Sequence, residues 1–233
     1  MHIVSLSFDD GFKESNEKIA KVYEKFGLSA CFNVLAVNII GNDPDQDQWQ
    51  PDGSRGDFDQ WNALQKRGHE IMPHGLIHNN LSEIPFEEAR QSILECLDIF
   101  EEKLAGFRRK EAVFNFPYND STPELDAWLR TEVRAFRKNG EAINPLPFMG
   151  QSALTTTGYG PENCEWHLEE HLVELFSRPS GWLIYNVHGV DGEGWGPIRS
   201  IYLENVLDRL TRMVSVSVLP VGTALNLADQ IQH

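Results

Sequence analysis

Four short stretches of the sequence carry side chains that can move protons or bind a cation. The residues are Asp9 and Asp10 in SFDDG, His74 and His78 in PHGLIHNN, Asn115, Tyr118 and Asp120 in FNFPYND, and His188 in LIYNVH. Each stretch directly follows an apolar run of the kind that forms strands. Two adjacent carboxylates repel each other, and together with three imidazoles and a tyrosine they exceed what stability requires. If the strand ends meet, the four stretches predict one polar site.

Taken singly, each stretch has an ordinary structural explanation. Asp10-Gly11 is a common turn pair. Pro73 and Gly75 exclude a helix around His74, so the H-x3-H pair would have to lie on a loop, where histidines are often simply solvated. A single histidine such as His188 is commonly a core residue that donates to a backbone carbonyl. The combination carries the prediction, because these residues follow predicted strands and none precedes one.

The elements that must position these residues alternate along the chain. Strands are predicted at 2–8, 30–37, 69–72, 112–116, 182–187 and 214–221, and helices at 13–26, 58–68, 85–104, 123–130, 166–176 and 201–213. Residues 142–160 cannot be assigned, and the polar stretch 38–56 is predicted to be a surface insertion. Repeated β-α units imply an α/β fold with a parallel sheet, doubly wound or closed as a barrel. In both cases functional residues gather at the carboxyl ends of the strands.

Composition narrows the classes of partner. With 41% hydrophobic and 24% charged residues, the 233-residue chain is expected to form one globular domain over 1–233. A net charge of −15 without a basic block argues against nucleic acid and anionic membranes as partners. No basic leader and no long apolar segment is visible, so the sequence predicts a cytoplasmic protein. The three cysteines are predicted to be buried free thiols, and the oligomeric state, a homo-oligomer included, stays open.

A second histidine pattern lies outside this set. Residues 167–171 match H-x-x-E-H, the inverted pattern of zinc proteases, within the helix predicted at 166–176. The predicted packing face of that helix consists of Trp166, Leu172, Val173 and Phe176. This face leaves the Glu and His positions in solvent, and so the protease hypothesis is set aside.

The four stretches together resemble the motifs of the polysaccharide deacetylases with a NodB homology domain, carbohydrate esterase family 4. The family's TFDDG, H-[S/T]-x-x-H and R-x-P-Y motifs correspond here to SFDDG, HGLIH and NFPY, and its late histidine motif corresponds to LIYNVH. Their order and spacing match over essentially the whole chain, and GWGP at 194–197 resembles a loop of some sugar deacetylase-like members. The resemblance implies an irregular (β/α) barrel with about seven parallel strands.

The resemblance also implies a divalent metal. Asp10, His74 and His78 would hold it, with Zn²⁺ as the first expectation and Co²⁺, Ni²⁺, Fe²⁺ or Mn²⁺ as alternatives. Three protein ligands with positions left for water and substrate are usual for a catalytic zinc site. Coordination would neutralise the charge of Asp10 and so remove its repulsion with the neighbouring carboxylate of Asp9.

The remaining roles concern protons and the substrate. The resemblance implies Asp9 as general base and His188 as the acid that protonates the departing amine. The backbone N–H of Tyr118 would stabilise the oxyanion, and Asn115 and Trp195 complete the predicted substrate group. The predicted reaction is hydrolysis of an amide C–N bond that removes an acetyl group from an N-acetylated sugar or oligosaccharide.

Several positions depart from the family pattern. Asn115 stands where the family has an arginine that pairs with the base, and an amide cannot lower a carboxylate pKa by charge. Gly75 replaces Ser or Thr, and Asn79 stands where proline is frequent. No copy of the fourth motif is found, so the acid that supports His188 is open between Asp120, Asp126 and Asp191. These changes predict altered specificity or weaker activity more readily than an inert protein.

Two other functions stay open. The first is an amidohydrolase of a ureide or cyclic imide, motivated by Asn115. The second is a catalytically silent carbohydrate-binding protein, in which sugar-stacking surfaces would come from Trp49, Trp61, Trp166 and Trp195. Burial in the core is the more common role of such tryptophans.

Overall fold

The computed structural model describes residues 1–37 and 55–230. The predicted insertion 38–56 therefore lies outside the described residues except for Arg55 and Gly56, and Trp49 also lies outside them. Arg55 forms an antiparallel bridge with Phe12, and the Gly56 N–H donates to the Gly11 carbonyl over 2.9 Å.

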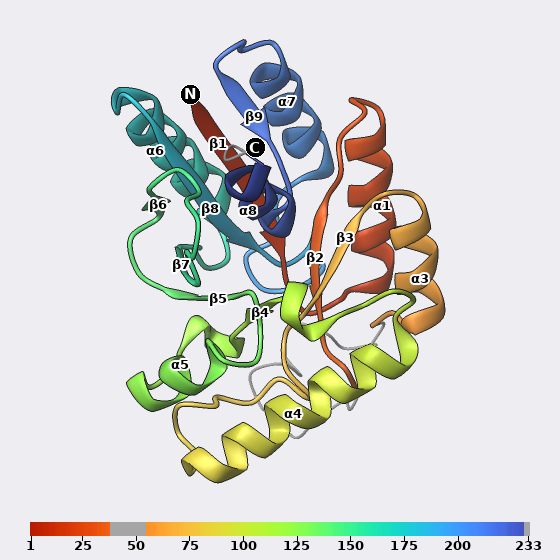
Figure 1. Ribbon diagram of the computed structural model, residues 1–233. Helices are drawn as coiled ribbons and strands as arrows, with labels where there is room; N and C mark the ends of the chain where they lie inside the picture. The colour runs from red at the N-terminus through yellow and green to blue at the C-terminus, as the bar shows by residue number, and fades with distance from the viewer. Residues whose placement is uncertain (38–54, 231–233) are drawn as a thin grey trace.

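Seven parallel strands form an irregular barrel in the described part of the chain (Figure 1). They are β1 (His2–Phe8), β2 (Cys31–Val34), β3 (Glu70–Pro73), β4 (Val113–Asn115), β5 (Ala135–Asn139), β7 (Ala153–Thr156) and β8 (Gly181–Val187). One ladder runs β3-β2-β1-β8 and a second runs β4-β5-β7. A parallel bridge between Thr157 and Tyr185 joins β7 to β8, and Val113 of β4 contacts Met72 of β3. The predicted barrel with about seven parallel strands is confirmed.

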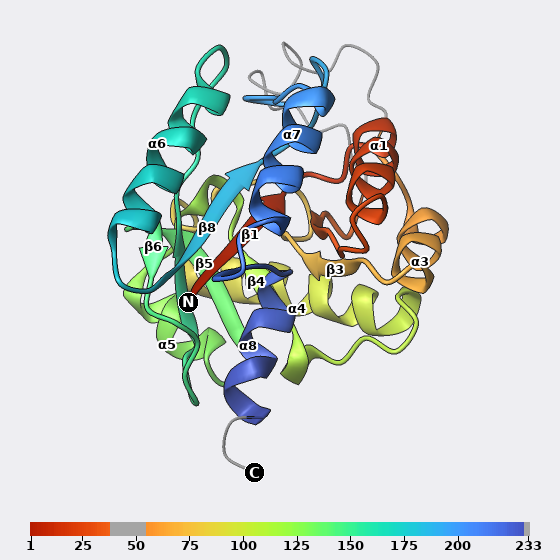
Figure 2. The ribbon, with the colours of Figure 1, turned by 90° about the horizontal axis from the view of Figure 1, so that it is seen from above.

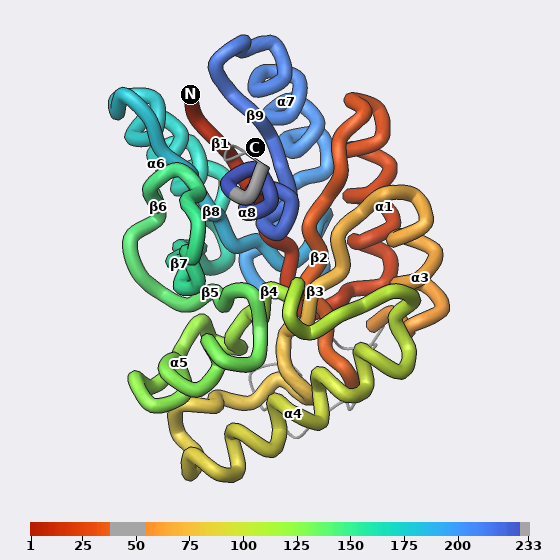
Figure 3. The backbone as a smooth tube through the Cα atoms, viewed as in Figure 1, coloured from red at the N-terminus to blue at the C-terminus, as the bar shows by residue number. Residues whose placement is uncertain are grey.

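Two short strands complete the sheet, and the helices surround it. Strand β6 (Ile143–Asn144) pairs antiparallel with β8, and β9 (Val216–Val218) pairs with the start of β1. The helices are α1 (Lys13–Glu24), α3 (Phe58–Lys66), α4 (Phe86–Lys103), α5 (Pro123–Leu129), α6 (Cys164–Ser177), α7 (Ser200–Thr211) and α8 (Val221–Gln230). Figures 1 and 2 show α1 and α3 on the opposite side of the barrel from α6. Figure 3 lets the chain be followed from β4 through β5 and β7 to β8.

The period of two along each strand divides the inside of the barrel into two layers. Near the amino ends the inward side chains are apolar: Ile3, Cys31, Val113, Ala135, Leu154 and Trp182. Towards the carboxyl ends they are buried and polar: Ser7, Asn33, Asn115, Arg137, Thr156 and Asn186. Buried polar groups require partners, because an unpaired one costs its full desolvation energy. The polar layer towards the carboxyl ends of the strands is therefore the part of the barrel interior where side chains able to do chemistry are found.

Helix α8 closes the apolar end of the barrel, which the sequence did not predict. Val221, Ala224 and Leu225 pack in one cluster with the inward residues of the lower layer. The Glu70 carboxylate, at the start of β3, accepts hydrogen bonds from the N–H groups of Gly222 and Thr223 over 2.9 and 3.0 Å. In Figure 2, β1 and β8 run away from the side on which α8 lies, so their carboxyl ends lie at the opposite end of the barrel.

Replacing Glu70 by alanine should lower the free energy of unfolding by about 1–2 kcal/mol, since its carboxylate caps the first turn of α8. Urea denaturation of the variant and of wild type measures this loss. Glu102→Ala, at an exposed position of α4, is the control and should change stability by less than about 0.5 kcal/mol. Equal stability of the two variants would contradict the capping role.

The predicted packing face of α6 is confirmed for Leu172 and Phe176 but wrong for Trp166 and Val173. Trp166 and Val173 are 60% and 70% exposed, and the helix packs through Cys164, Leu168, Leu172 and Leu175. This residue set is spaced three to four positions apart and so forms one stripe along the helix. The two histidines are half-buried: the His167 Nδ1 lies 2.8 Å from the Tyr185 hydroxyl, and the His171 Nδ1–H donates to the His167 carbonyl over 2.8 Å.

The thiols and the membrane prediction can be checked directly. Cys31, Cys96 and Cys164 are all free and buried, as the sequence predicts. Within residues 1–37 and 55–230, no helix has the length and apolar character needed to cross a membrane.

Candidate active site at the carboxyl end of the barrel

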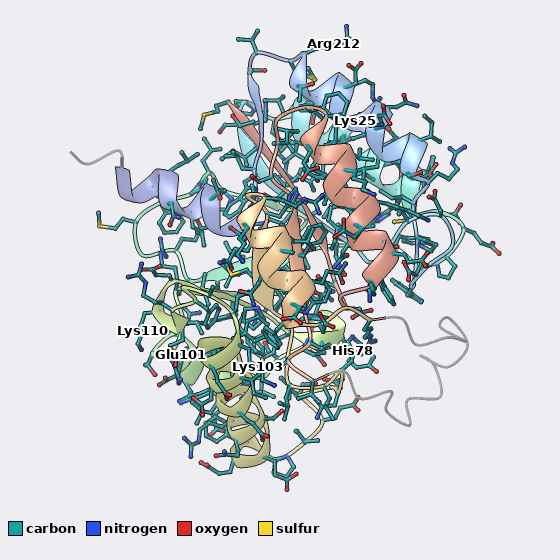
Figure 4. All side chains as sticks on the ribbon, turned by 90° about the vertical axis from the view of Figure 1, so that its right-hand side faces the viewer. Lys25, His78, Glu101, Lys103, Lys110 and Arg212 are labelled. Atoms are coloured by element: carbon teal, nitrogen blue, oxygen red, sulfur yellow. The ribbon has the colours of Figure 1, made fainter. Side chains whose placement is uncertain are left out.

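The barrel brings the predicted site residues to one end. Asp9 and Asp10 follow β1, His74 and His78 follow β3, and His188 follows β8. His78 is labelled in Figure 4, on the side of the molecule where α1 and α3 lie. Parallel strands expose their carboxyl ends at the same edge, and so residues far apart in sequence become neighbours.

Asp10, His74 and His78 form a compact group of three donors. Their nearest ligand atoms all lie within 4.8 Å of one another. The Asp10 Oδ1 is 3.4 Å from the His74 Nε2 and 3.5 Å from the His78 Nε2. This oxygen is buried and accepts no hydrogen bond within the described residues, which is costly for a carboxylate. A cation between the three atoms would remove that cost.

The chemistry of the three donors suits a divalent metal. The His74 Nδ1–H donates to the Asn115 carbonyl over 2.9 Å, which leaves the Nε2 atom facing Asp10. Burial lowers the pKa of His78 to about 4, against the opposing charge of Asp10. Burial also opposes ionisation of Asp10, but His78 and His74 outweigh it and hold the Asp10 pKa well below its usual range. Two imidazoles and one carboxylate fit zinc and similar ions.

The turn after β1 requires an unusual backbone. Asp10 and Gly11 have φ of 75° and 80°, in the left-handed region that residues with a side chain rarely adopt. A Cβ on Gly11 would lie 3.0 Å from the Trp61 ring. Trp61 itself is buried, so it supplies a wall beneath this turn rather than a sugar-stacking surface.

Asp9 is held by a charged partner that the sequence did not reveal. Arg137 of β5 is fully buried, and its two terminal nitrogens donate to the Asp9 Oδ1 and Oδ2 over 3.0 and 2.5 Å. The Arg137 Nη1 also donates to the Ser7 hydroxyl over 2.7 Å. Burial raises the pKa of Asp9, but the Arg137 guanidinium and His74 outweigh it, so the Asp9 pKa lies below its usual value. The expectation that Asp9 lacks a cationic partner is therefore wrong.

The pairing of β4 with β5 explains how the arginine reaches Asp9. Asn115 and Arg137 are register partners in the parallel ladder, so their side chains enter the barrel side by side. The positively charged partner of Asp9 thus comes from β5, whereas the family motif places its arginine at position 115 of the neighbouring strand β4. The Asn115 amide does not contact Asp9: its Nδ2 donates to the Asn33 Oδ1 over 2.8 Å.

Two asparagines complete the environment of Asp9. The Asn33 Nδ2 donates to the Asp9 Oδ1 over 2.6 Å, and the Asn186 Nδ2 donates to the Asp9 Oδ2 over 2.7 Å. Asn186 is oriented in turn by the Asn119 amide, at 3.2 Å. These donors fix the plane of the Asp9 carboxylate next to Asp10 and His74.

Tyr118 lies beside His78, one of the three donors. It belongs to a short 3-10 turn, Pro117–Asn119, where its φ is 56° and that of Asn119 is 53°. Two consecutive left-handed residues store strain that the surrounding fold must hold. The Tyr118 ring is half-exposed and packs on His78, with 4.7 Å between ring centroids.

His188 and Trp195 make a T-shaped ring contact, with 5.4 Å between centroids. The three carboxylates considered for its support bind elsewhere: Asp120 to Ser82, Asp126 to Lys138, and Asp191 to the Ser200 N–H. Across the described ranges, no carboxylate is hydrogen-bonded to His188. When protonated, His188 is one of the smaller contributions that lower the pKa values of Asp9 and Asp10.

The fold and the site define a parallel α/β barrel whose mouth holds the three donors Asp10, His74 and His78 beside an arginine-bound carboxylate. The family model for polysaccharide deacetylases matches residues 1–134. The chain belongs to the polysaccharide deacetylase family. No curated protein sequence matches it.

Solved structures share the fold at low sequence identity. A putative polysaccharide deacetylase from Mycobacterium smegmatis superposes with a TM-score of 0.72 and 13% identity, covering 99% of this chain and 91% of that one. The peptidoglycan deacetylase PdaC from Bacillus subtilis gives a TM-score of 0.56 and 18% identity, covering 99% and 93%. The catalytic domain of a peptidoglycan N-acetylglucosamine deacetylase from Eubacterium rectale ATCC 33656 gives 0.60 and 15%, covering 95% and 89%. These similarities concern the NodB-like fold.

Proposed function

We propose that this protein is a metal-dependent hydrolase that removes an acetyl group from an N-acetylated sugar or oligosaccharide. The observation that carries the proposal is the convergence of Asp10, His74 and His78 next to an Asp9 held by Arg137. Zn²⁺ is the first candidate, because two imidazoles and a carboxylate with open positions are typical of catalytic zinc. Co²⁺, Ni²⁺, Fe²⁺ and Mn²⁺ suit the same donors.

When bound, the cation would act as a Lewis acid towards the amide carbonyl and would acidify water. Asp9 would accept the proton of the attacking water, since its carboxylate is fixed in place and ionised at neutral pH. As the water oxygen bonds to the acyl carbon, the backbone N–H of Tyr118 would donate to the developing oxyanion. The C–N bond then breaks, and protonated His188 would give its proton to the amine nitrogen. Acetate and a free amino sugar are the products.

The rival functions lose their main support. The ureide or imide amidohydrolase was motivated by the missing arginine at 115, and Arg137 supplies that charge from the neighbouring strand. A silent carbohydrate-binding protein has no need of a buried ion pair beside a cation group, because burying charges carries a large desolvation cost.

Acetate release from a panel of N-acetylated sugars tests the proposal, using protein loaded with each of the five metals. Wild type should release acetate, and His188→Gln should lower kcat by about 10²–10⁴-fold while keeping its metal content. Absence of acetate with every sugar and metal would overturn the proposal. Turnover of a ureide or cyclic imide that survives chelation would favour the amidohydrolase instead.

A further inference from the structure

Two histidines of α6 have no part in the proposed chemistry, although they form a close pair. His167 and His171 lie one turn apart on the helix, with 4.2 Å between their ring centroids and an angle of 52° between the ring planes. Side chains four positions apart share one face of a helix, so two imidazoles at this spacing can bind one ion between them. Figures 1 and 2 show α6 on the outside of the barrel, beside β8.

Each of the two rings is held through its Nδ1 atom. The His171 Nδ1–H donates to the His167 carbonyl over 2.8 Å, and the His167 Nδ1 lies 2.8 Å from the Tyr185 hydroxyl. That hydroxyl donates in turn to the Cys164 carbonyl over 3.1 Å. Tyr159 packs on the His167 ring, with 4.8 Å between centroids and 30° between the planes. Histidines that bind metals commonly have their other ring nitrogen held by the protein in this way.

The Nε2 atoms of the two rings are left for a ligand. Within residues 1–37 and 55–230, neither Nε2 makes a hydrogen bond and neither is buried away from solvent. Both side chains are half-buried, so the rings keep few rotamers and lose little freedom when an ion binds. Because the protein engages each Nδ1, Nε2 is the atom that a cation from solvent reaches.

The charges around the pair favour a metal ion. Burial and the neighbouring His171 lower the pKa of His167, so a proton competes less for this imidazole at neutral pH. Three of the four glutamates of α6 are paired with arginines. The fourth, Glu170, is exposed and forms no ion pair among the described residues, and it precedes His171 directly. A chain with a net charge of −15 also attracts cations to its surface.

We infer that His167 and His171 form an accessory site for a transition-metal ion, with Cu²⁺ preferred over Ni²⁺ and Zn²⁺. Imidazole suits all three ions, and sites with nitrogen donors bind Cu²⁺ most tightly among the divalent first-row metals. The site is separate from the group of Asp10, His74 and His78, and it does not depend on the proposed function.

The ion at this accessory site would be exchangeable. In the described part of the chain, no third His, Cys, Asp or Glu joins the pair within 4.8 Å, so water would fill the other positions. Catalytic zinc sites use three protein ligands. The H-x-x-E-H pattern of α6 therefore supplies a metal-binding pair without protease chemistry, and prolonged dialysis should remove its ion.

Isothermal titration calorimetry of the full chain with Cu²⁺ tests the inference by counting ions. Wild type should bind two ions per chain, and His171→Gln and Asp10→Asn should bind one each. The double variant should bind none. His171→Gln is a mild change, because this side chain hydrogen-bonds only within its own helix, so the metal-free melting temperature should stay at the wild-type value. Glu170→Gln is the control on the same helix and should keep both ions, since the two imidazoles supply the ligands.

Electron paramagnetic resonance identifies the donors. The Cu²⁺ spectrum of Asp10→Asn should show hyperfine splitting from two nitrogens, which His171→Gln added to that variant should remove. The accessory site is wrong if His171→Gln binds as many ions as wild type, or if the double variant keeps the splitting. A failure of the proposed function gives a different result: wild type then binds a single ion, which His171→Gln loses and Asp10→Asn keeps.

Discussion

Replacing Arg137 by methionine should lower the free energy of unfolding by about 3–5 kcal/mol at neutral pH and reduce kcat/KM by about 10–100-fold. Arg137 and Asp9 are both buried, so the variant leaves a carboxylate in the barrel with only neutral donors. Asn33 and Asn186 would still bind it, but an amide dipole does not replace a cation at this distance. Chemical denaturation and acetate release measure the two effects.

The chain offers a matched control for this variant. Arg109 also binds two carboxylates, those of Asp98 and Glu101, but on the surface. Because exposed ion pairs contribute about 0–1 kcal/mol, Arg109→Met should cost less than about 1 kcal/mol and leave activity unchanged. If the two variants lose similar stability and activity, the Arg137 pair has no special role.

A double variant separates stability from catalysis. Asp9→Asn alone leaves Arg137 buried and unpaired, so it should lose stability as well as turnover. The double variant Asp9→Asn with Arg137→Met removes both charges. Its loss in free energy of unfolding should be smaller than the sum of the losses of the two single variants. It should remain inactive, since the proposed base is absent. Recovered activity in the double variant would exclude Asp9 as the base.

The pH dependence of the Arg137 variant follows from the sign of the Asp9 shift. Arg137 lowers the Asp9 pKa, so the pair contributes its full stability above the ordinary pKa of an aspartate and loses it as pH falls through the lowered value. Without Arg137, burial acts in the opposite direction and raises that pKa. The variant should therefore recover stability relative to wild type as the medium is made more acidic, where Asp9 is protonated in both.

The sequence predicted the parts of this fold that follow from local patterns. Continuous apolar runs ending in polar residues marked β1 and β8, and the site residues at those ends converge as expected for parallel strands. The resemblance of SFDDG and HGLIH to the family motifs implied Asp10, His74 and His78 as one donor set, and the structure brings the three donors together.

The residue missed was Arg137, for a physical reason. It lies in AFRKN, a five-residue strand that carries an arginine and a lysine. Such side chains are normally exposed to solvent. Only the pairing with β4 shows that the Arg137 side chain enters the barrel beside that of Asn115. The Asn139-Gly140 pair directly after it is a turn signal that marks the end of a strand, and it was the one local indication available.

The α6 and α8 errors share another cause. Both helices bury faces against the barrel that depend on what the neighbouring strands present. On α6, Trp166 faces outward while Cys164 and Leu168 pack inward. A prediction that places the largest apolar side chains on the packing face is therefore wrong for this helix. Helix α8 follows β9 without a long linker, and its role as a plug depends on Glu70, some 150 positions away in the chain.

Adding a divalent metal should stabilise the wild-type protein by about 2.7 kcal/mol at a free concentration of one hundred times the Kd, because only the folded chain brings the three donors together. Asp10→Asn should abolish this stabilisation and the turnover, since an amide oxygen supplies no charge to the cation. Differential scanning calorimetry with Zn²⁺ added or chelated measures the shift, and elemental analysis after dialysis measures bound metal.

Asp120→Asn is the control for this experiment. Asp120 is an exposed carboxylate at the same end of the barrel, hydrogen-bonded to Ser82 and outside the three-donor group. Its variant should keep the full metal-dependent stabilisation. Asp9→Asn should also keep its metal while losing activity, because Asp9 contacts Arg137 and two asparagines rather than completing the donor set. Adjacent carboxylates with separable losses would establish that Asp10 binds the cation and Asp9 acts on the proton, whereas identical losses in the two variants would refute that division.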